Sequence, residues 1–318
     1  MTPVILAADS GIDNACQALQ CRPVHLPEES GVSSTPAHCE ESAMGASDIL
    51  IHLRRCEDGL GAAEAGLRLA RRLDAHALGL HVVALSPAAF ASPEAVALHA
   101  SEASHLLEEA RARAPWWQGE LQRFGVDGDF QVVQGDVVDA LGHAARWSDL
   151  VVVERPIQNP DAPVGWGIVS RTVFASSAPV VVVPESARVE NIARHVVIAW
   201  NGSREATLAV RGALPLLAQA ERVVVLEGEA GGDGFGPGAL PRLDLRAWLA
   251  RRGIEASFVP FQPARDAHGP SVLEAAHAHD ADLIVTGAWG HSRITELVLG
   301  GVTRHLFQHS DLPLLVAH

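Results

Sequence analysis

Glycines near the C-terminus are the residues of this chain best suited to bind an anion. Four of them punctuate a loop between the apolar run 283–285 and a helical pattern: Gly287, Gly290, Gly300 and Gly301. Glycine permits positive φ and close approach of the backbone, so such a loop exposes N–H donors. A helix starting near Val302 would add its positive end. The spacing predicts a phosphate-binding loop, and the alternative is that the glycines are only turn residues.

A second candidate segment follows the apolar run 196–200, where Asn201, Gly202 and Ser203 come in succession. The Asn201 side chain can hydrogen-bond a base or a ribose, whereas Ser203 can contact a ligand or simply cap the next helix. In a doubly wound sheet this strand would lie beside the strand at 282–285, where the strand order reverses and ligands bind. We therefore predict that both segments belong to one site.

Other residues with catalytic or metal-binding chemistry form weaker patterns. His305 and His309 have a spacing that can bind a metal, but their segment lacks the glutamate of a zinc protease motif, so exposed helix positions are the preferred interpretation. The cysteines match no Cys-x-x-Cys spacing: Cys16, Cys21, Cys39 and Cys56. No Ser/His/Asp order or carboxylate pair stands out, so we predict neither a metal site nor an efficient catalyst.

Composition excludes several classes of function. The formal net charge is −14, which argues against attraction to nucleic acid or to an anionic membrane. Every one of the 24 basic residues is arginine, so Schiff-base chemistry and the lysine of a P-loop are excluded. No apolar run is long enough to span a membrane, and the N-terminus lacks the basic segment of a secretory signal. We expect a cytoplasmic protein that binds neither nucleic acid nor membrane.

From residue 48 onward, strand-like runs alternate with helical patterns, which predicts parallel strands covered by helices on both faces. The order restarts after residue 186. The run 149–153 corresponds to 282–286 and the helical pattern 169–174 to 302–307, both 133 residues apart. We predict an α/β protein with two tandem Rossmann-like domains, 48–185 and 194–318, each a five-stranded parallel sheet with helices on both faces. The alternative is one ten-stranded domain.

Three further expectations concern individual segments. Residues 1–47 lack sustained periodicity and are predicted to be a poorly ordered extension. Met44 stands just before the first strand, which suggests the hypothesis that translation starts there and that 1–43 are not native. The helical patterns predict one helix over 93–124 and another over 206–218.

The first copy has lost most of the glycines of the predicted loop. At the same separation, Gly287 corresponds to Glu154, Gly290 to Ile157 and Gly301 to Ile168, with only Gly300 matched by a glycine, Gly167. A carboxylate at position 154 would face the place of the phosphates and repel them. If one half binds a nucleotide, we predict that it is the second.

Residues 197–203, the loop Gly287-x2-Gly290-x9-Gly300, and the run from Val302 to Leu306 together resemble the universal stress protein family, in its tandem two-domain form. The resemblance extends over about residues 48–318. It implies the adenine-nucleotide-binding α/β fold, domains paired through their last strands, and ATP or AMP as ligand, with magnesium accompanying ATP. It further implies a sensor or regulator of a stress response, with unidentified protein partners and a possible homodimer.

The resemblance also implies roles for single residues. Gly287 and Gly290 would approach the ribose and phosphates, Asn201 the adenosine. The phosphates would meet the start of the last helix, and the predicted site is completed by its remaining members: Gly202, Ser203, Gly300, Gly301, Val302 and Thr303. Binding members of the family usually have Asp in place of Asn201 and a hydroxyl residue in place of Gly301, so one phosphate donor is missing. The alternatives are therefore an interaction protein that binds no nucleotide, or a slow ATPase.

Overall fold

The computed structural model describes residues 47–59, 61–84, 93–156, 167–187, 189–228, 244–263, 267–288 and 301–318, with the backbone alone over 93–100. All of them belong to the second of the two compact units of the chain, Ala43–His318. The predicted extension 1–47 lies outside the described residues except for Ser47, and so does the Met44 hypothesis.

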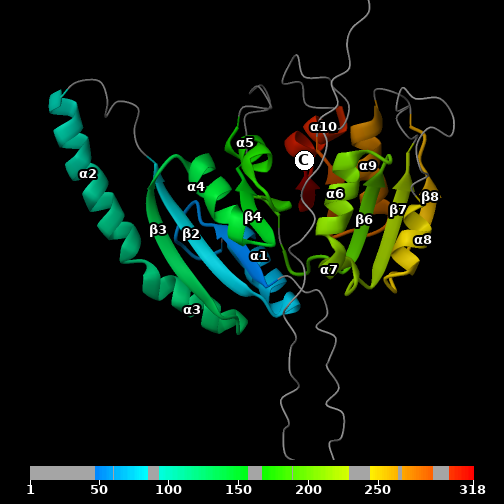
Figure 1. The fold of residues 1–318 in the computed structure, drawn as a ribbon, viewed down its shortest axis with the longest axis horizontal. Helices are drawn as coiled ribbons and strands as arrows, with labels where there is room; N and C mark the ends of the chain where they lie inside the picture. The colour runs from blue at the N-terminus through cyan, green and yellow to red at the C-terminus, as the bar shows by residue number, and fades with distance from the viewer. Residues whose placement is uncertain are drawn as a thin grey trace, which may run out of the picture. The chain divides into compact units, whose positions relative to one another are not determined.

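Strands and helices alternate through both halves of the chain (Figure 1). The first half contains β1 (Asp48–His52), α1 (Gly61–Leu73), β2 (His76–Ala84), α2 (Pro93–Arg111), α3 (Ala114–Phe124), β3 (Gly128–Gly135), α4 (Val137–Ala144), the 3-10 helix η2 (Ala145–Trp147), β4 (Leu150–Arg155), α5 (Ile168–Ala175) and β5 (Val180–Pro184). The second half contains β6 (His195–Trp200), α6 (Arg204–Gly212), α7 (Leu214–Leu217), β7 (Arg222–Glu227), α8 (Leu245–Ala250), β8 (Ser257–Pro260), α9 (His268–Ala278), β9 (Leu283–Gly287), α10 (Gly301–His309) and β10 (Leu314–Ala317).

The ten strands of the described residues form one sheet in the order β3-β2-β1-β4-β5-β10-β9-β6-β7-β8. Within each half all pairs are parallel, and the two halves repeat the same strand order. The predicted α/β architecture with parallel strands is therefore confirmed. The exact division into domains at 48–185 and 194–318 stays a prediction.

The halves meet through their last strands, β5 and β10, which pair antiparallel. Leu315 faces Val181, and the flanking pairs are Leu314 with Val182 and Val316 with Val180. In these strands equivalent residues are 134 apart, because the Val151 amide donates to the Pro179 carbonyl and the Ile284 amide to that of Pro313. Leu315 and Val181 are therefore equivalent, and the flanking pairs exchange places about them, as in a two-fold symmetric dimer interface. This confirms the pairing of last strands that the family resemblance implied.

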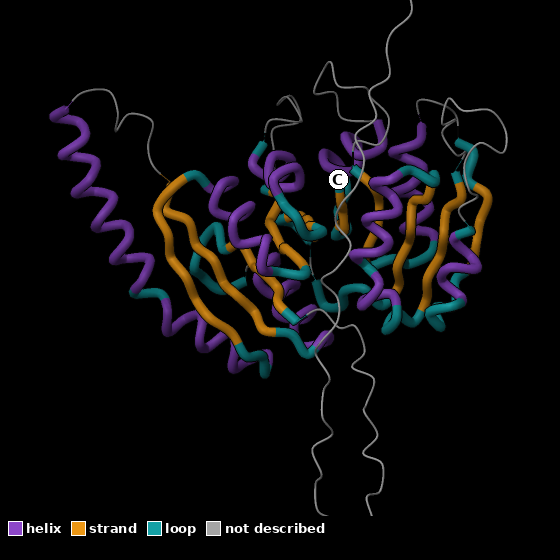
Figure 2. Tube along the Cα trace, viewed as in Figure 1, coloured by secondary structure: helices purple, strands orange, loops and turns teal. Residues whose placement is uncertain are grey.

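Helices cover both faces of the sheet, because strand side chains alternate between them (Figure 2). One core contains residues of α1, α3, α6 and α8, and the other contains residues of α4, α5, α9 and α10. Ile49 packs in the first core and its neighbour Leu50 in the second. The strands are therefore buried on both sides, which explains their continuous apolar runs.

Two predicted helices are each divided in the structure. The segment 93–124 contains α2 and α3, separated at Ala112–Arg113, and Pro115 lies in the first turn of α3. The segment predicted as a helix over 206–218 contains α6 and α7, which meet at Ala213 just before Pro215. Proline has no amide hydrogen to donate to the preceding turn, so a helix restarts there more readily than it continues.

Candidate functional site

The predicted site segments meet at one edge of the sheet. β6 pairs parallel with β9, with Val196 opposite Leu283 and Ala199 opposite Thr286. The next strand along the chain from β6 lies on one side, and the next strand from β9 on the other. The carboxyl ends of β6 and β9 therefore form the point where the strand order reverses, as the sequence predicted.

The turn after β6 is stabilised by its own side chains. Gly202 has φ +74°, a conformation that favours glycine. The Asn201 Oδ1 accepts a hydrogen bond from the Ser203 amide at 3.1 Å, and the Ser203 Oγ accepts one from the Ala206 amide at 3.1 Å. Ser203 is thus the N-cap of α6, the alternative that the sequence left open.

Gly287 is the point at which the end of β9 meets two helices. A Cβ atom there would lie 2.4 Å from the Ala206 amide nitrogen and 2.9 Å from the Glu205 Cβ, both in the first turn of α6. On the α10 side, the buried Thr303 hydroxyl donates to the Gly287 carbonyl at 3.4 Å. Close packing of β9 against both helix starts therefore requires glycine at this position.

A Gly287→Ala substitution should lower the free energy of unfolding by about 2 kcal/mol, because backbone atoms cannot yield as a flexible side chain can. Urea denaturation followed by circular dichroism measures this loss. The control is Gly135→Ala at the end of β3, where a Cβ atom meets nothing within 4 Å. Equal stability of the two variants would show that β9 can move away from α6.

The start of α10 is open. Among the described residues, no atom outside its own helix lies within 4 Å of the position that a Cβ of Gly301 would occupy, and Gly301 is exposed. The first amides of a helix lack partners within the helix, so those of Gly301, Val302 and Thr303 suit an anion. Val302 is half-buried against the core of that face. Gly290 and Gly300, the other predicted phosphate residues, lie outside the described residues.

Sequence reasoning missed two arginines in the first turns of these helices. Arg204 is the first residue of α6 and Arg304 lies in the first turn of α10, and both are exposed. Arg204 follows the turn of Asn201 and Arg304 follows Gly301, whereas Arg293, within the predicted loop, lies outside the described residues. Their place directly after the Gly-containing turns was the signal that could have identified them.

In the first half an ion-pair cluster occupies the corresponding edge. Glu154, the counterpart of Gly287, is 4% exposed, and its Oε1 accepts a hydrogen bond from Arg54 Nη1 at 2.8 Å. Arg55 pairs with Glu185 at 3.1 Å. Burial raises the pKa of Glu154, and Arg54 opposes this rise. The expectation of a carboxylate facing a ligand therefore needs correction, because the structure buries Glu154 against Arg54 instead.

Arg155, next to Glu154, connects this cluster with α10 of the other half. Its Nη1 donates to the carbonyl oxygens of Leu306 at 2.9 Å and Phe307 at 2.8 Å, and its Nη2 donates to that of Ser310. The Leu306 carbonyl also accepts the Ser310 amide at 3.0 Å, whereas Phe307 lies in the last turn of α10, where helix carbonyls lack partners within the helix. A residue of the first half thus holds the far end of the helix whose start is the predicted phosphate position.

The remaining sequence candidates are separate from this edge. Among the described residues, no three His, Cys, Asp or Glu side chains are placed to hold a metal ion. His309 is exposed as predicted, but His305 is half-buried, and burial together with His309 lowers its pKa. Cys56 is half-buried, and burial raises its pKa to about 11.

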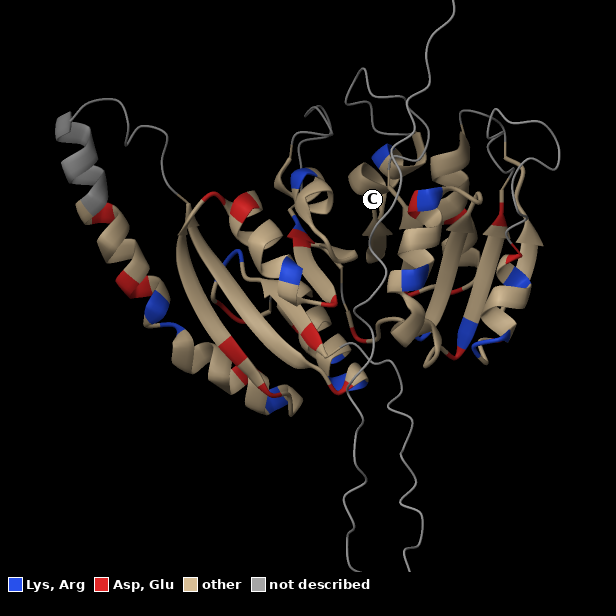
Figure 3. Ribbon diagram, viewed as in Figure 1, with Lys and Arg blue, Asp and Glu red and all other residues tan. Residues whose placement is uncertain are grey.

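Charge and hydrophobicity of the described residues agree with the composition. Arginine and acidic positions are interspersed over both halves, without a continuous basic stripe in the drawn part of the chain (Figure 3). No described helix is both long and apolar enough to cross a membrane.

Comparison with known proteins identifies the second half. Residues 193–318 match the family model of the universal stress protein family. This segment is a universal stress protein domain. A universal stress protein from Archaeoglobus fulgidus, 17% identical, aligns over 85% of this chain and 97% of its own with a TM-score of 0.65. A functionally unknown protein from Pseudomonas aeruginosa, 12% identical, aligns over 86% and 92% with a TM-score of 0.52.

The likeness to the Archaeoglobus fulgidus protein extends the fold over both halves of the chain, since its alignment covers far more than residues 193–318. No curated protein matches the sequence.

Proposed function

We propose that the universal stress protein domain binds an adenine nucleotide, ATP or AMP, above the ends of β6 and β9, and that the chain senses or regulates a stress response through it. The observation that carries the proposal is the convergence at Gly287, where the end of β9 meets the starts of α6 and α10, while no neighbouring element of the described residues covers Gly301. A Gly-lined strand end beside two helix N-termini suits a phosphate group.

The residues present fit such a ligand. The α10 amides from Gly301 onward would hold the phosphates, and Arg204 would supply a positive charge. The adenosine would lie near Asn201, whose Oδ1 already accepts one hydrogen bond within its own turn. Magnesium would accompany ATP through its phosphates. A cytoplasmic location and a homodimer belong to the same proposal.

Gly301→Asp should weaken ATP binding at least about tenfold, because a carboxylate at the helix start repels phosphate. The same change should leave folding intact, since the position is open and acidic residues stabilise helix starts. Isothermal titration calorimetry with ATP and magnesium, repeated with AMP, measures the affinity. Gly301→Ala is the matched control and should change it less than about threefold, whereas Gly301→Ser should strengthen it by adding a hydroxyl donor.

Absence of binding to the native protein at millimolar nucleotide would contradict the proposal. It would favour the second candidate, an interaction protein of the same fold. That candidate is supported by the first half, where Glu154 and Arg54 already fill the corresponding edge. If binding is found, ATP left with the protein for hours and then assayed for ADP separates a sensor from a slow ATPase.

A further inference from the structure

The second half contains a hollow between α6 and α8, beside Trp200, the last residue of β6. Its volume is about 310 Å³. Two indole rings, two aliphatic side chains and two guanidinium groups contribute to its lining: Trp200, Trp248, Val210, Leu245, Arg211 and Arg251. Small-molecule sites are typically concave and mostly apolar, with a few polar groups, and have volumes from roughly 300 Å³ upward.

The first half differs here at two positions: it has an indole in place of Leu245, and that indole packs on Gly79, where the second half has Val225. α3 and α8 both end at a glycine with positive φ, Gly125 at +65° and Gly253 at +70°. Counting back from these glycines makes Trp117 of α3 the counterpart of Leu245. Trp117 is fully buried, and its Nε1 donates to the Asp129 carbonyl at 3.0 Å. The second half thus has a smaller side chain where the first has an indole in its core.

In the first half, side chains of α3 and α1 contact each other. Arg123 of α3 pairs with Glu64 of α1 at 3.1 Å, and Arg68 of α1 lies 5.3 Å from the ring centre of Phe124 of α3. No ion pair joins α6 to α8 among the described residues.

The two arginines of the hollow lack partners of their own. Arg211 and Arg251 are exposed, and within the described part of the chain no hydrogen bond or ion pair engages either guanidinium group. Arg252, by contrast, lies over the Trp248 ring at 3.8 Å. The acidic residue of the lining, Asp244, is occupied as the N-cap of α8, since its Oδ1 accepts from the Ala247 amide at 2.8 Å. The hollow thus combines apolar surface with unpaired positive charge in a protein of net charge −14.

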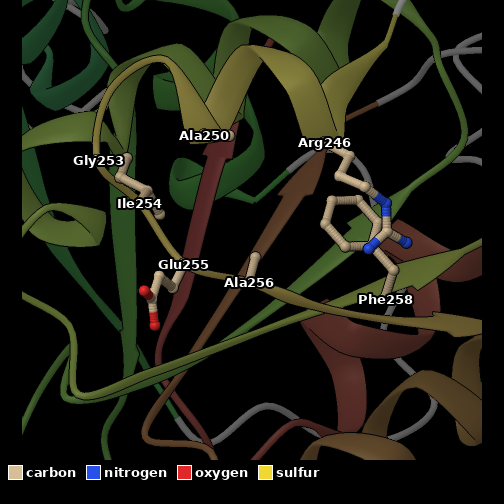
Figure 4. A pocket seen from close by; sticks show the side chains of 7 residues that line it. All are labelled: Arg246, Ala250, Gly253, Ile254, Glu255, Ala256 and Phe258. Carbon is tan, nitrogen blue, oxygen red and sulfur yellow. The ribbon is translucent and has the colours of Figure 1, made fainter.

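A larger hollow of about 420 Å³ has a counterpart in the first half. It lies under the α8–β8 connection, where the Arg246 guanidinium stacks 3.9 Å above the Phe258 ring (Figure 4). The first half has a hollow at the corresponding α3–β3 connection, which includes Gly125 and Val126. Since both copies have it, this edge hollow follows from the fold.

We propose that the hollow between α6 and α8 binds a planar aromatic anion, such as an aromatic carboxylate. The ring would lie against the indoles of Trp200 and Trp248, which favour aromatic partners. The carboxylate would be held by Arg211 and Arg251, whose planar guanidinium groups match its geometry. The site lies between α6 and α8 on one face of the sheet, and competition with ATP tests whether it is distinct from the nucleotide site above the strand ends.

Titration of the full-length protein with 2-naphthoate tests the proposal. Calorimetry should show saturable binding of one molecule with a dissociation constant of about 1 mM or tighter. The Arg211→Gln/Arg251→Gln variant should bind about tenfold more weakly, because both charge partners are lost. The uncharged 2-naphthamide should bind the native protein about tenfold more weakly too, and the double variant should no longer distinguish the two ligands.

Two further variants define the place of binding. Arg111→Gln/Arg146→Gln removes the same charge at exposed positions away from the hollow and should leave 2-naphthoate affinity unchanged. Leu245→Trp enlarges a side chain of the lining and should abolish binding; circular dichroism checks its folding, because Val225 takes the place of the Gly79 that accommodates the first half's indole. The proposal is overturned by any of three results: no saturable binding up to about 5 mM, equal binding to the Arg211/Arg251 variant, or displacement of 2-naphthoate by ATP.

Discussion

Replacing Arg155 by methionine should lower the free energy of unfolding by about 3 kcal/mol. Methionine keeps most of the apolar length of the side chain but donates no hydrogen bond. The carbonyls of Leu306, Phe307 and Ser310 would each lose their charged donor. These three residues are at most 4% exposed, so water cannot readily take its place.

Urea denaturation of the native protein and the variant measures this loss. Hydrogen exchange of the α10 amides locates it, because a helix released at its C-terminal end should exchange faster along its length. Nucleotide affinity should fall as well if α10 holds the phosphates.

Arg171→Met is the control for this prediction. Arg171 is an exposed arginine of α5, 3.7 Å from Asp136, and its loss should cost less than about 0.5 kcal/mol. A cost below about 1 kcal/mol for Arg155→Met would mean that the α10 carbonyls find other partners.

Acidification should destabilise the protein by up to about 3 kcal/mol between pH 6.5 and pH 4 through His52 alone. His52 of β1 is 5% exposed. Burial, His81 and Arg54 lower its pKa from 6.5 to about 4. The unfolded chain therefore binds a proton in this window that the folded chain does not. The stabilising contribution is complete above pH 6.5 and is lost as the pH falls towards 4.

Denaturation midpoints of the native protein and His52→Gln across this pH range test the prediction. The variant should show a flatter dependence, because glutamine does not titrate. The groups facing His52 remain in both proteins. The difference between the two stability curves therefore gives the contribution of His52. Glu154 changes stability in the opposite direction: burial raises its pKa, so its contribution grows as the pH falls.

His143→Gln, an exposed substitution on α4, is the control and should leave the pH dependence of the native protein unchanged. Parallel curves for the native protein and His52→Gln would show that water or a local rearrangement solvates the protonated ring.

Local patterns in the sequence predicted the strands and most helices well. β6 begins within one residue of the predicted run 196–200, and α10 begins within one residue of Val302, its predicted start. Apolar runs buried on both faces leave a continuous signal, which is why the parallel sheet was predictable. The breaks at Ala112–Arg113 and Ala213 were missed, although Pro115 and Pro215 marked both.

The candidate site was predictable only as far as strand order allows. Because equivalent strand ends of a parallel sheet meet at one edge, the sequence placed Asn201 near Gly287. It could not reveal that Gly287 is needed by the first turn of α6, nor that Glu154 is buried against Arg54. The Arg155 contact with Leu306 joins residues 151 apart, and such a distance leaves no local pattern to recognise.

The antiparallel pair of β5 and β10 makes the association of the two halves independent of protein concentration. Partners on one chain meet at an effective concentration that dilution cannot lower. The paired edges are also unavailable to a second chain, so any homodimer must use other surfaces; the free edges of the described sheet are β3 and β8. Each half always pairs with the other half of the same chain, so the two can differ. The first half has buried charges at its strand ends, whereas the second has an exposed helix start.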